Sequence, residues 1–102
     1  MATAVQYGAK VKTFISNNGS YGTIRMHQEL AYKKRVHGTE LRNPDFAKWA
    51  ESFGALGLSM STIEEAPKIV EQALAHDGPV VVDVKTALEH ISPFATIASL
   101  RG

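Results

Sequence analysis

One stretch of the chain decides the expected fold, and it reads Phe14-Ile15-Ser16-Asn17-Asn18-Gly19-Ser20-Tyr21-Gly22-Thr23-Ile24. An apolar run from Val11 to Ile15 ends in two asparagines and a glycine, and a helix-like pattern follows directly. This order places a tight loop between the carboxyl end of a strand and the amino end of a helix. In open α/β sheets that position binds phosphorylated ligands, because the first helical turn offers free N–H groups and a partial positive charge. Asparagine oxygens also suit a hard cation such as magnesium, so the stretch predicts a diphosphate held through a metal ion.

The rest of the chain alternates between helix and strand. Strands are expected at residues 11–16, 56–60 and 80–84, and helices at residues 2–8, 20–32, 43–54 and 61–77. The valine-rich run 80–84 is typical of a strand buried on both faces, as in a parallel sheet. Three strands separated by helices predict right-handed crossovers and an α/β fold, namely a three-layer sandwich with a short parallel sheet and helices on both faces.

Four local features carry more specific expectations. Ser20 is expected to cap the helix after the asparagine loop, and Asn43 to cap the next helix, with Pro44 at its first position. Trp49 belongs to an aromatic stripe at helical spacing, which indicates a place in the core. Residues 91–102 are expected to form a tail in which Pro93 breaks any regular element.

Composition is that of one modest domain, residues 1–102. The chain has 11 Lys and Arg against 10 Asp and Glu, so the balance of charge indicates no nucleic-acid partner. There are no cysteines, which excludes disulfides and thiolate chemistry and is compatible with the expected cytoplasmic location. No apolar run approaches the roughly 20 residues that a membrane-spanning helix needs, and the amino terminus does not look like a signal peptide.

Four segments together resemble one enzyme family. Residues 17–29 resemble the second half of the thiamine diphosphate motif, which opens with Gly-Asp-Gly and closes with a pair of asparagines. Residues 2–8 are similar to the helix before that motif's strand, and residues 43–46 and 78–84 match later parts of the same domain. The resemblance covers nearly the whole chain and is to the carboxyl-terminal part of the diphosphate-binding domain of acetolactate synthase-like enzymes.

The resemblance implies a cofactor, thiamine diphosphate with Mg²⁺, in the full-length parent enzyme. It assigns the metal to the Asn18 side-chain oxygen and the Ser20 backbone carbonyl. The N–H groups of Tyr21, Gly22 and Thr23 would face the diphosphate, where the missing side chain of Gly22 lets the backbone approach closely. These five residues are the expected cofactor-binding set, and no catalytic residue is assigned.

The chain lacks two parts of the family's machinery. It contains no Gly-Asp-Gly element, whose aspartate is the anionic metal ligand in the family, and neutral oxygens alone hold magnesium poorly. The activating glutamate of the family belongs to a separate pyrimidine-binding domain, usually on a neighbouring subunit. The chain is therefore expected to be a carboxyl-terminal piece, inactive alone, whose partners are the rest of the parent enzyme, a 2-oxo acid substrate and further copies in a homo-oligomer.

Two positions bear on the parent's chemistry, a transferase or lyase reaction that decarboxylates or joins 2-oxo acids. Ile24 stands where pyruvate decarboxylases have a glutamate, and an aliphatic side chain cannot deliver a proton. Carbon–carbon bond formation is therefore favoured over simple decarboxylation. His27 stands where acetohydroxyacid synthases have a tryptophan, so the match to that selectivity is incomplete.

Two other classes of protein are also compatible with this sequence. The chain could be a non-catalytic α/β interaction domain derived from the same fold, or a flavodoxin-like nucleotide binder that uses the loop from Asn17 to Gly22. The cluster Lys33-Lys34-Arg35 could be an anion patch, although three charges are more often a solvated loop.

Overall fold

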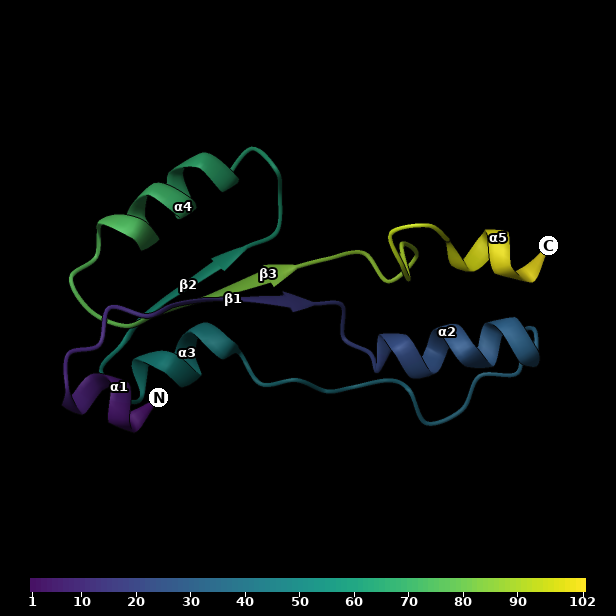
Figure 1. Ribbon diagram of the computed structural model, residues 1–102, viewed down its shortest axis with the longest axis horizontal. Helices are drawn as coiled ribbons and strands as arrows, with labels where there is room; N and C mark the ends of the chain where they lie inside the picture. The colour runs from purple at the N-terminus through teal and green to yellow at the C-terminus, as the bar shows by residue number, and fades with distance from the viewer. The chain divides into compact units, whose positions relative to one another are not determined.

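The computed structural model describes residues 1–102, and the chain forms two compact units. The sheet unit contains Met1–Asn17 and Pro44–Lys85, and the helical unit contains Asn18–Asn43 and Thr86–Gly102. Figure 1 shows the secondary structure of both. The asparagine pair is thus divided, because Asn17 ends the first segment of the sheet unit and Asn18 begins the helical unit.

The sheet unit is built around three parallel strands (Figure 1). They are β1 (Lys12–Asn17), β2 (Leu56–Met60) and β3 (Val80–Lys85), in the order β1-β3-β2. Val82 in the centre of β3 is in register with Phe14 of β1 and Leu58 of β2. The last strand in the sequence is therefore the central one, which explains why it is almost entirely valine and buried.

Helices cover both faces of this sheet, so the expected α/β three-layer sandwich is confirmed. On one face, α1 (Ala2–Gln6) and α3 (Phe46–Glu51) contribute to a core around Val81 and Ala50. On the other, Ala73 of α4 (Ala66–Ala75) packs with Val80 and Val82. Alternate valines of β3 thus serve opposite cores, as the two-residue period of a strand requires.

Gly57 of β2 lies in close contact with the backbone of α3. A Cβ atom at this position would lie 2.0 Å from the carbonyl oxygen of Ala47 in α3. Only a residue without a side chain lets α3 lie this close to the strand, and Ala47 is itself small and buried. A pair of small residues therefore fixes the distance between α3 and β2.

Two expectations about α3 are wrong in detail. The N-cap is Asp45, whose carboxylate accepts a hydrogen bond from Lys48 N at 3.0 Å, so neither Asn43 nor Pro44 begins the helix. Trp49 is 42% exposed and makes an edge-to-face contact with Phe53, with ring centroids 5.2 Å apart. The helical spacing was correct, but the fully buried position on α3 is Ala50.

The helical unit contains α2 (Gly22–Ala31) and α5 (Ile97–Arg101), which pack against each other (Figure 1). Ser20 does not cap α2: the N-cap is Tyr21, and no side chain caps the helix. The expectation of an irregular tail over residues 91–102 is also wrong. Pro93 lies before α5 and not within it, so a short helix forms behind a Thr96–Ser99 capping box.

None of these helices combines the length and the apolar character that crossing a membrane would need.

Candidate functional site

The candidate site is the loop of residues 18–23 in the helical unit. The Asn18 Oδ1 atom accepts a hydrogen bond from Ser20 N at 3.0 Å, which closes a tight turn around Gly19. Gly19 has φ of 66°, a left-handed conformation that glycine adopts without strain. The backbone conformation therefore explains the Asn-Gly order: Asn18 closes the turn, and Gly19 adopts the left-handed conformation that the turn needs.

A second segment, residues 39–41, fixes this loop. The Tyr21 N–H donates to the Thr39 carbonyl at 2.9 Å, and the Leu41 N–H donates to the Gly19 carbonyl at 2.8 Å. The Ser20 hydroxyl also donates to the Thr39 carbonyl, at 2.8 Å. The Ser20 side chain therefore ties the loop to this segment, which is a long-range contact that local sequence pattern could not reveal.

The first turn of α2 keeps its donors open. The first N–H groups of a helix have no intrahelical acceptor, and α2 has no capping side chain. Arg25 N makes the first helical hydrogen bond, to the carbonyl of Tyr21. The Tyr21 N–H is engaged by Thr39, so it is not one of the open donors. Gly22, Thr23 and Ile24 carry them, two of which are in the predicted set.

Gly22 has little room for a side chain. A Cβ atom there would lie 3.0 Å from the Asn18 Nδ2 atom, which is tighter than ordinary packing. A hollow of about 310 Å³ lies directly over this turn and is lined by Ser20, Tyr21, Gly22, Thr23 and Ile24. The open N–H groups and the hollow therefore occur at the same residues.

The residues present fit a diphosphate group and part of a metal shell. The helix start supplies N–H donors and the positive end of the helix dipole, which suit an anion. The Asn18 Oδ1 atom has a second lone pair beyond the one that Ser20 N uses. The hydroxyl oxygen of Thr39, behind the loop, is buried without a hydrogen-bond partner. No three His, Asp or Glu residues gather anywhere in the chain, so these neutral oxygens would need an anionic ligand from elsewhere.

The sheet unit contains a buried carboxylate that the sequence pattern did not single out. Asp83 of β3 is 1% exposed, and it accepts hydrogen bonds from Asn17 Nδ2 at 3.0 Å and Lys85 Nζ at 2.8 Å. Burial by itself would raise the pKa of Asp83, but the hydrogen bonds from Lys85 and Asn17 outweigh it, so the pKa lies below its ordinary value. The only sequence feature that could have indicated this buried carboxylate is the presence of an aspartate within a run of valines. Asn17 therefore fixes the end of β1.

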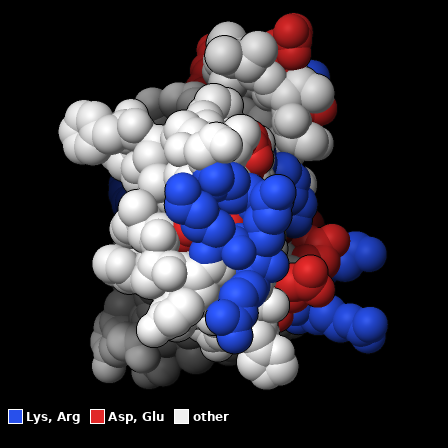
Figure 2. Space-filling model, turned by 90° about the vertical axis from the view of Figure 1, so that its right-hand side faces the viewer, with Lys and Arg blue, Asp and Glu red and all other residues white.

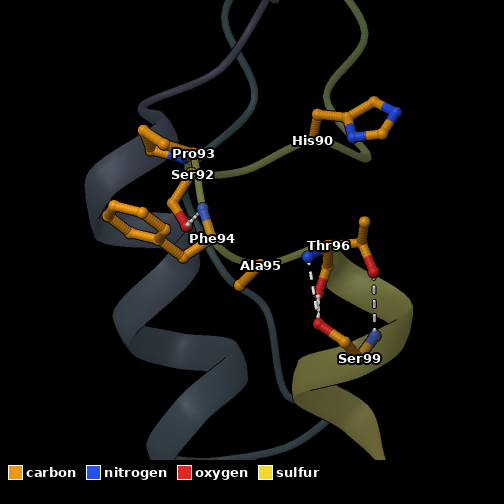
Figure 3. Close-up of a pocket in the computed structure, with 7 residues that line it drawn as sticks. All are labelled: His90, Ser92, Pro93, Phe94, Ala95, Thr96 and Ser99. Atoms are coloured by element: carbon orange, nitrogen blue, oxygen red, sulfur yellow. Dashed lines mark hydrogen bonds between the residues drawn. The ribbon is translucent and has the colours of Figure 1, made fainter.

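Two further hollows carry no comparable chemistry. One of about 250 Å³ lies beside the turn before α5, where Figure 3 shows His90, Pro93 and Phe94 together with the Thr96–Ser99 capping box. The other, of about 490 Å³, lies beside α4 and includes Glu65, whose carboxylate already accepts from the backbone N–H groups of Ser61 and Thr62. In the first hollow the hydroxyl groups of Ser92, Thr96 and Ser99 take part in hydrogen bonds within their own turns, and none of them is hydrogen-bonded to His90.

Comparison with known proteins identifies the family. Residues 1–84 match the family described as "Thiamine pyrophosphate enzyme, C-terminal TPP binding domain". The chain belongs to this family. The match includes β1, β2, all but the last residue of β3 and the candidate loop, so the predicted resemblance is confirmed.

Its relatives are large enzymes. The mitochondrial acetolactate synthase of Schizosaccharomyces pombe is 36% identical over 95 residues, which is 92% of this chain and 14% of that protein. The acetolactate synthase of Mycobacterium bovis is 39% identical over 89 residues, which is 81% of this chain and 14% of that protein. The crystal structure of benzoylformate decarboxylase from Polynucleobacter necessarius superposes with a TM-score of 0.76 at 27% identity, covering 86% of this chain and 17% of that one.

The chain thus spans about one seventh of the length of the curated relatives that it matches. Membership of the family establishes a carboxyl-terminal thiamine pyrophosphate-binding domain. The individual roles of Asn18, Ser20, Tyr21, Gly22 and Thr23 stay predictions.

Proposed function

We propose that this chain is the cofactor-anchoring segment of a thiamine diphosphate-dependent enzyme that decarboxylates 2-oxo acids or joins them to an acceptor. In this proposal the first turn of α2 binds the diphosphate. Asn18 and Ser20 contribute two neutral oxygens to the Mg²⁺ shell. The isolated chain is inactive.

The observation that carries the proposal is the open start of α2. Gly22 and Thr23 present N–H groups beneath a hollow, with the Asn18 side chain directly beside Gly22. An anion in this hollow would satisfy donors that the protein itself leaves unsatisfied. Such an arrangement supports diphosphate binding more directly than the Asn-Gly turn alone does.

The chemistry of the reaction comes from the cofactor, which stabilises the carbanion that a 2-oxo acid leaves after losing carbon dioxide. The residues of this chain bind the cofactor and orient it. Ile24 and His27 are exposed on α2, in the first and second turns of the helix. Ile24 carries no transferable proton, which favours transfer of the carbanion to a carbon acceptor over its protonation.

The partners in this proposal are the remaining parts of the parent enzyme, including the pyrimidine-binding domain, and further copies in a homo-oligomer. The metal shell needs an anionic ligand, because Asn18 and Ser20 are neutral donors. The sheet also has an edge at β1, where Phe14 is 44% exposed. An added strand at this edge would bury Phe14 and use the outward backbone groups of β1.

A chimera tests the anchoring role. The chain replaces the corresponding carboxyl-terminal segment of the M. bovis acetolactate synthase, and Mg²⁺-dependent binding of thiamine diphosphate is measured by calorimetry. We expect Asn18→Ala to weaken binding at least about tenfold, because a metal ligand is lost. Gln72→Ala, which also removes an amide side chain but lies on α4, should leave the affinity unchanged.

Two results would contradict this proposal. A folded chimera that binds the cofactor with the same affinity in the Asn18→Ala form would overturn the assignment of the metal ligand. A folded chimera that does not bind the cofactor at all would favour the alternative, a non-catalytic α/β interaction domain. The absence of an acidic cluster in the chain is the observation that keeps this alternative in view.

A further inference from the structure

Glu29 of α2 is a fully buried carboxylate held by four donors. Arg101 of α5 donates from Nη2 to Oε1 at 2.7 Å and from Nε to Oε2 at 2.8 Å. Arg25 Nε donates to Oε1 at 2.9 Å, and the backbone N–H of Lys34 donates to Oε2 at 3.3 Å. The Arg101 contact joins residues 72 positions apart in the sequence, so it fixes tertiary structure and not a local turn.

These contacts make Glu29 and Arg101 interdependent. The hydrogen bond from Arg101 is the largest cause that lowers the pKa of Glu29, which is about 2. The same bond raises the pKa of Arg101. A two-pronged arginine–carboxylate pair is strong and geometrically specific, and removing Arg101 leaves the buried carboxylate with only Arg25 and the Lys34 N–H as donors. The contact therefore fixes the orientation of one helix against the other.

The segment around α5 has little other means of forming a helix. At five residues α5 is too short to be stable alone. It is held by the Thr96–Ser99 capping box, which Figure 3 shows, and by burial of Ile97. Glu89 also accepts a hydrogen bond from Ala98 N at 2.8 Å. All of these contacts place Arg101 opposite Glu29.

The same segment also reaches the other end of α2. The Cδ1 atom of Ile91 lies 4.0 Å from the position that a Cβ atom of Gly22 would occupy. Ile91 is thus beside the first residue of α2, and Arg101 is beside Glu29, two turns further along. Residues 89–101 therefore contact α2 near both of its ends, and we name this segment the C-terminal clamp.

We propose that the C-terminal clamp positions α2, and that Arg101 is a positioning residue for the first turn of that helix. The inference rests on the proposed function in one respect, since that turn is where the diphosphate would bind. Arg101 itself touches no ligand. It acts through Glu29 and the helix that both residues hold, while Ile91 restricts the space beside Gly22.

Replacing Arg101 removes a positive charge as well as the contact with Glu29, so the effect of the charge on α2 must be measured separately. Figure 2 shows basic side chains gathered on one face of the molecule. Around Glu29 the basic residues are Arg25, Lys33, Lys34, Arg35 and Arg101, and the exposed side chains of Lys33, Lys34 and Arg35 form no ion pair. Arg35→Gln is therefore the matched control, because it removes the same charge from the same region without touching Glu29.

The test uses the ¹⁵N-labelled full chain at pH 7 and follows amide hydrogen exchange residue by residue. Arg101→Gln should speed exchange of residues 25–31 in α2 at least about tenfold, and should shift the amide resonances of Gly22 and Thr23. Amides of β3 in the sheet unit should exchange as in the wild type. Arg35→Gln should leave α2 exchange unchanged.

Two outcomes overturn the proposal. Exchange of α2 within about twofold of wild type in Arg101→Gln would mean that the C-terminal clamp does not position the helix. An equal rise in α2 and β3 would mean a general loss of stability. If Arg101→Gln does not fold, Arg101→Lys, which keeps the charge but loses the two-pronged geometry, is judged by the same two criteria.

A pyrophosphate titration separates this proposal from the proposed function. Inorganic pyrophosphate is added to the wild-type chain, and the amide resonances of Gly22, Thr23 and Ile24 are followed. No shift at any of them would count against anion binding at the start of α2. The exchange data would still decide whether the C-terminal clamp positions the helix, because they require no ligand.

Discussion

Single residues in this chain act mainly through the space that they leave or the charge that they hold. Gly57 lets α3 approach β2, and Gly22 leaves room beside the Asn18 side chain. Asp83 and Glu29 are buried carboxylates, one in each unit, and each is surrounded by donors. None of these roles depends on the residue's own helix or strand propensity.

Gly57→Ala gives a prediction at this scale. Its Cβ atom would lie 2.0 Å from a backbone oxygen, so α3 must move away from the sheet. We expect the free energy of unfolding to fall by about 3 kcal/mol, as measured by urea titration with Trp49 fluorescence. Gly8→Ala, in the same unit, is the control. Its Cβ atom meets no other atom but the position is strained at φ of 61°, so the change should cost only about 1 kcal/mol. Equal losses in both variants would contradict the close contact.

Two helices begin at other residues than the sequence predicts, α3 because of a local cap and α2 because of a tertiary contact. Asn43, Pro44 and Asp45 are consecutive residues that could each begin α3. Asp45 is the N-cap, because its carboxylate accepts a hydrogen bond from the Lys48 N–H. Near α2, Ser20 is drawn to the Thr39 carbonyl instead of capping the helix. The α2 start is consequently left open, which is the feature that supports anion binding.

Asp45→Ala tests the assignment of the α3 start. Loss of the side-chain hydrogen bond to Lys48 N should lower the free energy of unfolding by about 1 kcal/mol, again read from Trp49 fluorescence in urea. Asp45→Ser keeps an oxygen at the same position and should recover most of this loss. If Asp45→Ala and Asp45→Ser were equally destabilised, capping would not be the role of Asp45.

At the scale of the whole molecule, each unit has its own carboxylate-centred polar cluster. Both carboxyl groups have a lowered pKa in the folded chain, and that of Glu29 is about 2 against an ordinary 4.5. A group with a lowered pKa adds stability that is fully present above its ordinary pKa and is lost as the pH falls through the folded value. The two units should therefore both weaken in acid.

An acid titration checks this expectation. Packing of α2 against α5 should be stable above pH 4.5 and be lost between about pH 4.5 and 2, and the contribution of Asp83 should be lost below about pH 3.8. Trp49 fluorescence reports the sheet unit, and amide exchange of α2 reports the helical unit. Glu29→Gln should remove the acid response of the helical unit only. A stability that rises on acidification would contradict the signs of both shifts.

The sequence alone determined the alternation of helices and strands up to residue 85, the parallel sheet and the family. Periodic apolar runs, a valine-rich strand and the Asn-Asn-Gly loop are local signals, and local backbone physics translates them directly into elements. The loop residues could also be named in advance, because a strand–turn–helix junction has the same chemistry wherever it occurs.

Tertiary structure alone decided which donors of that loop remain open and what holds its helix. The Tyr21 N–H is occupied because residues 39–41 fold back onto the loop, and Trp49 is exposed because Ala50 faces the sheet. The pairing of Glu29 with Arg101 joins residues 72 positions apart. Such contacts join segments that are far apart in the sequence. A pattern of neighbouring residues therefore cannot predict them.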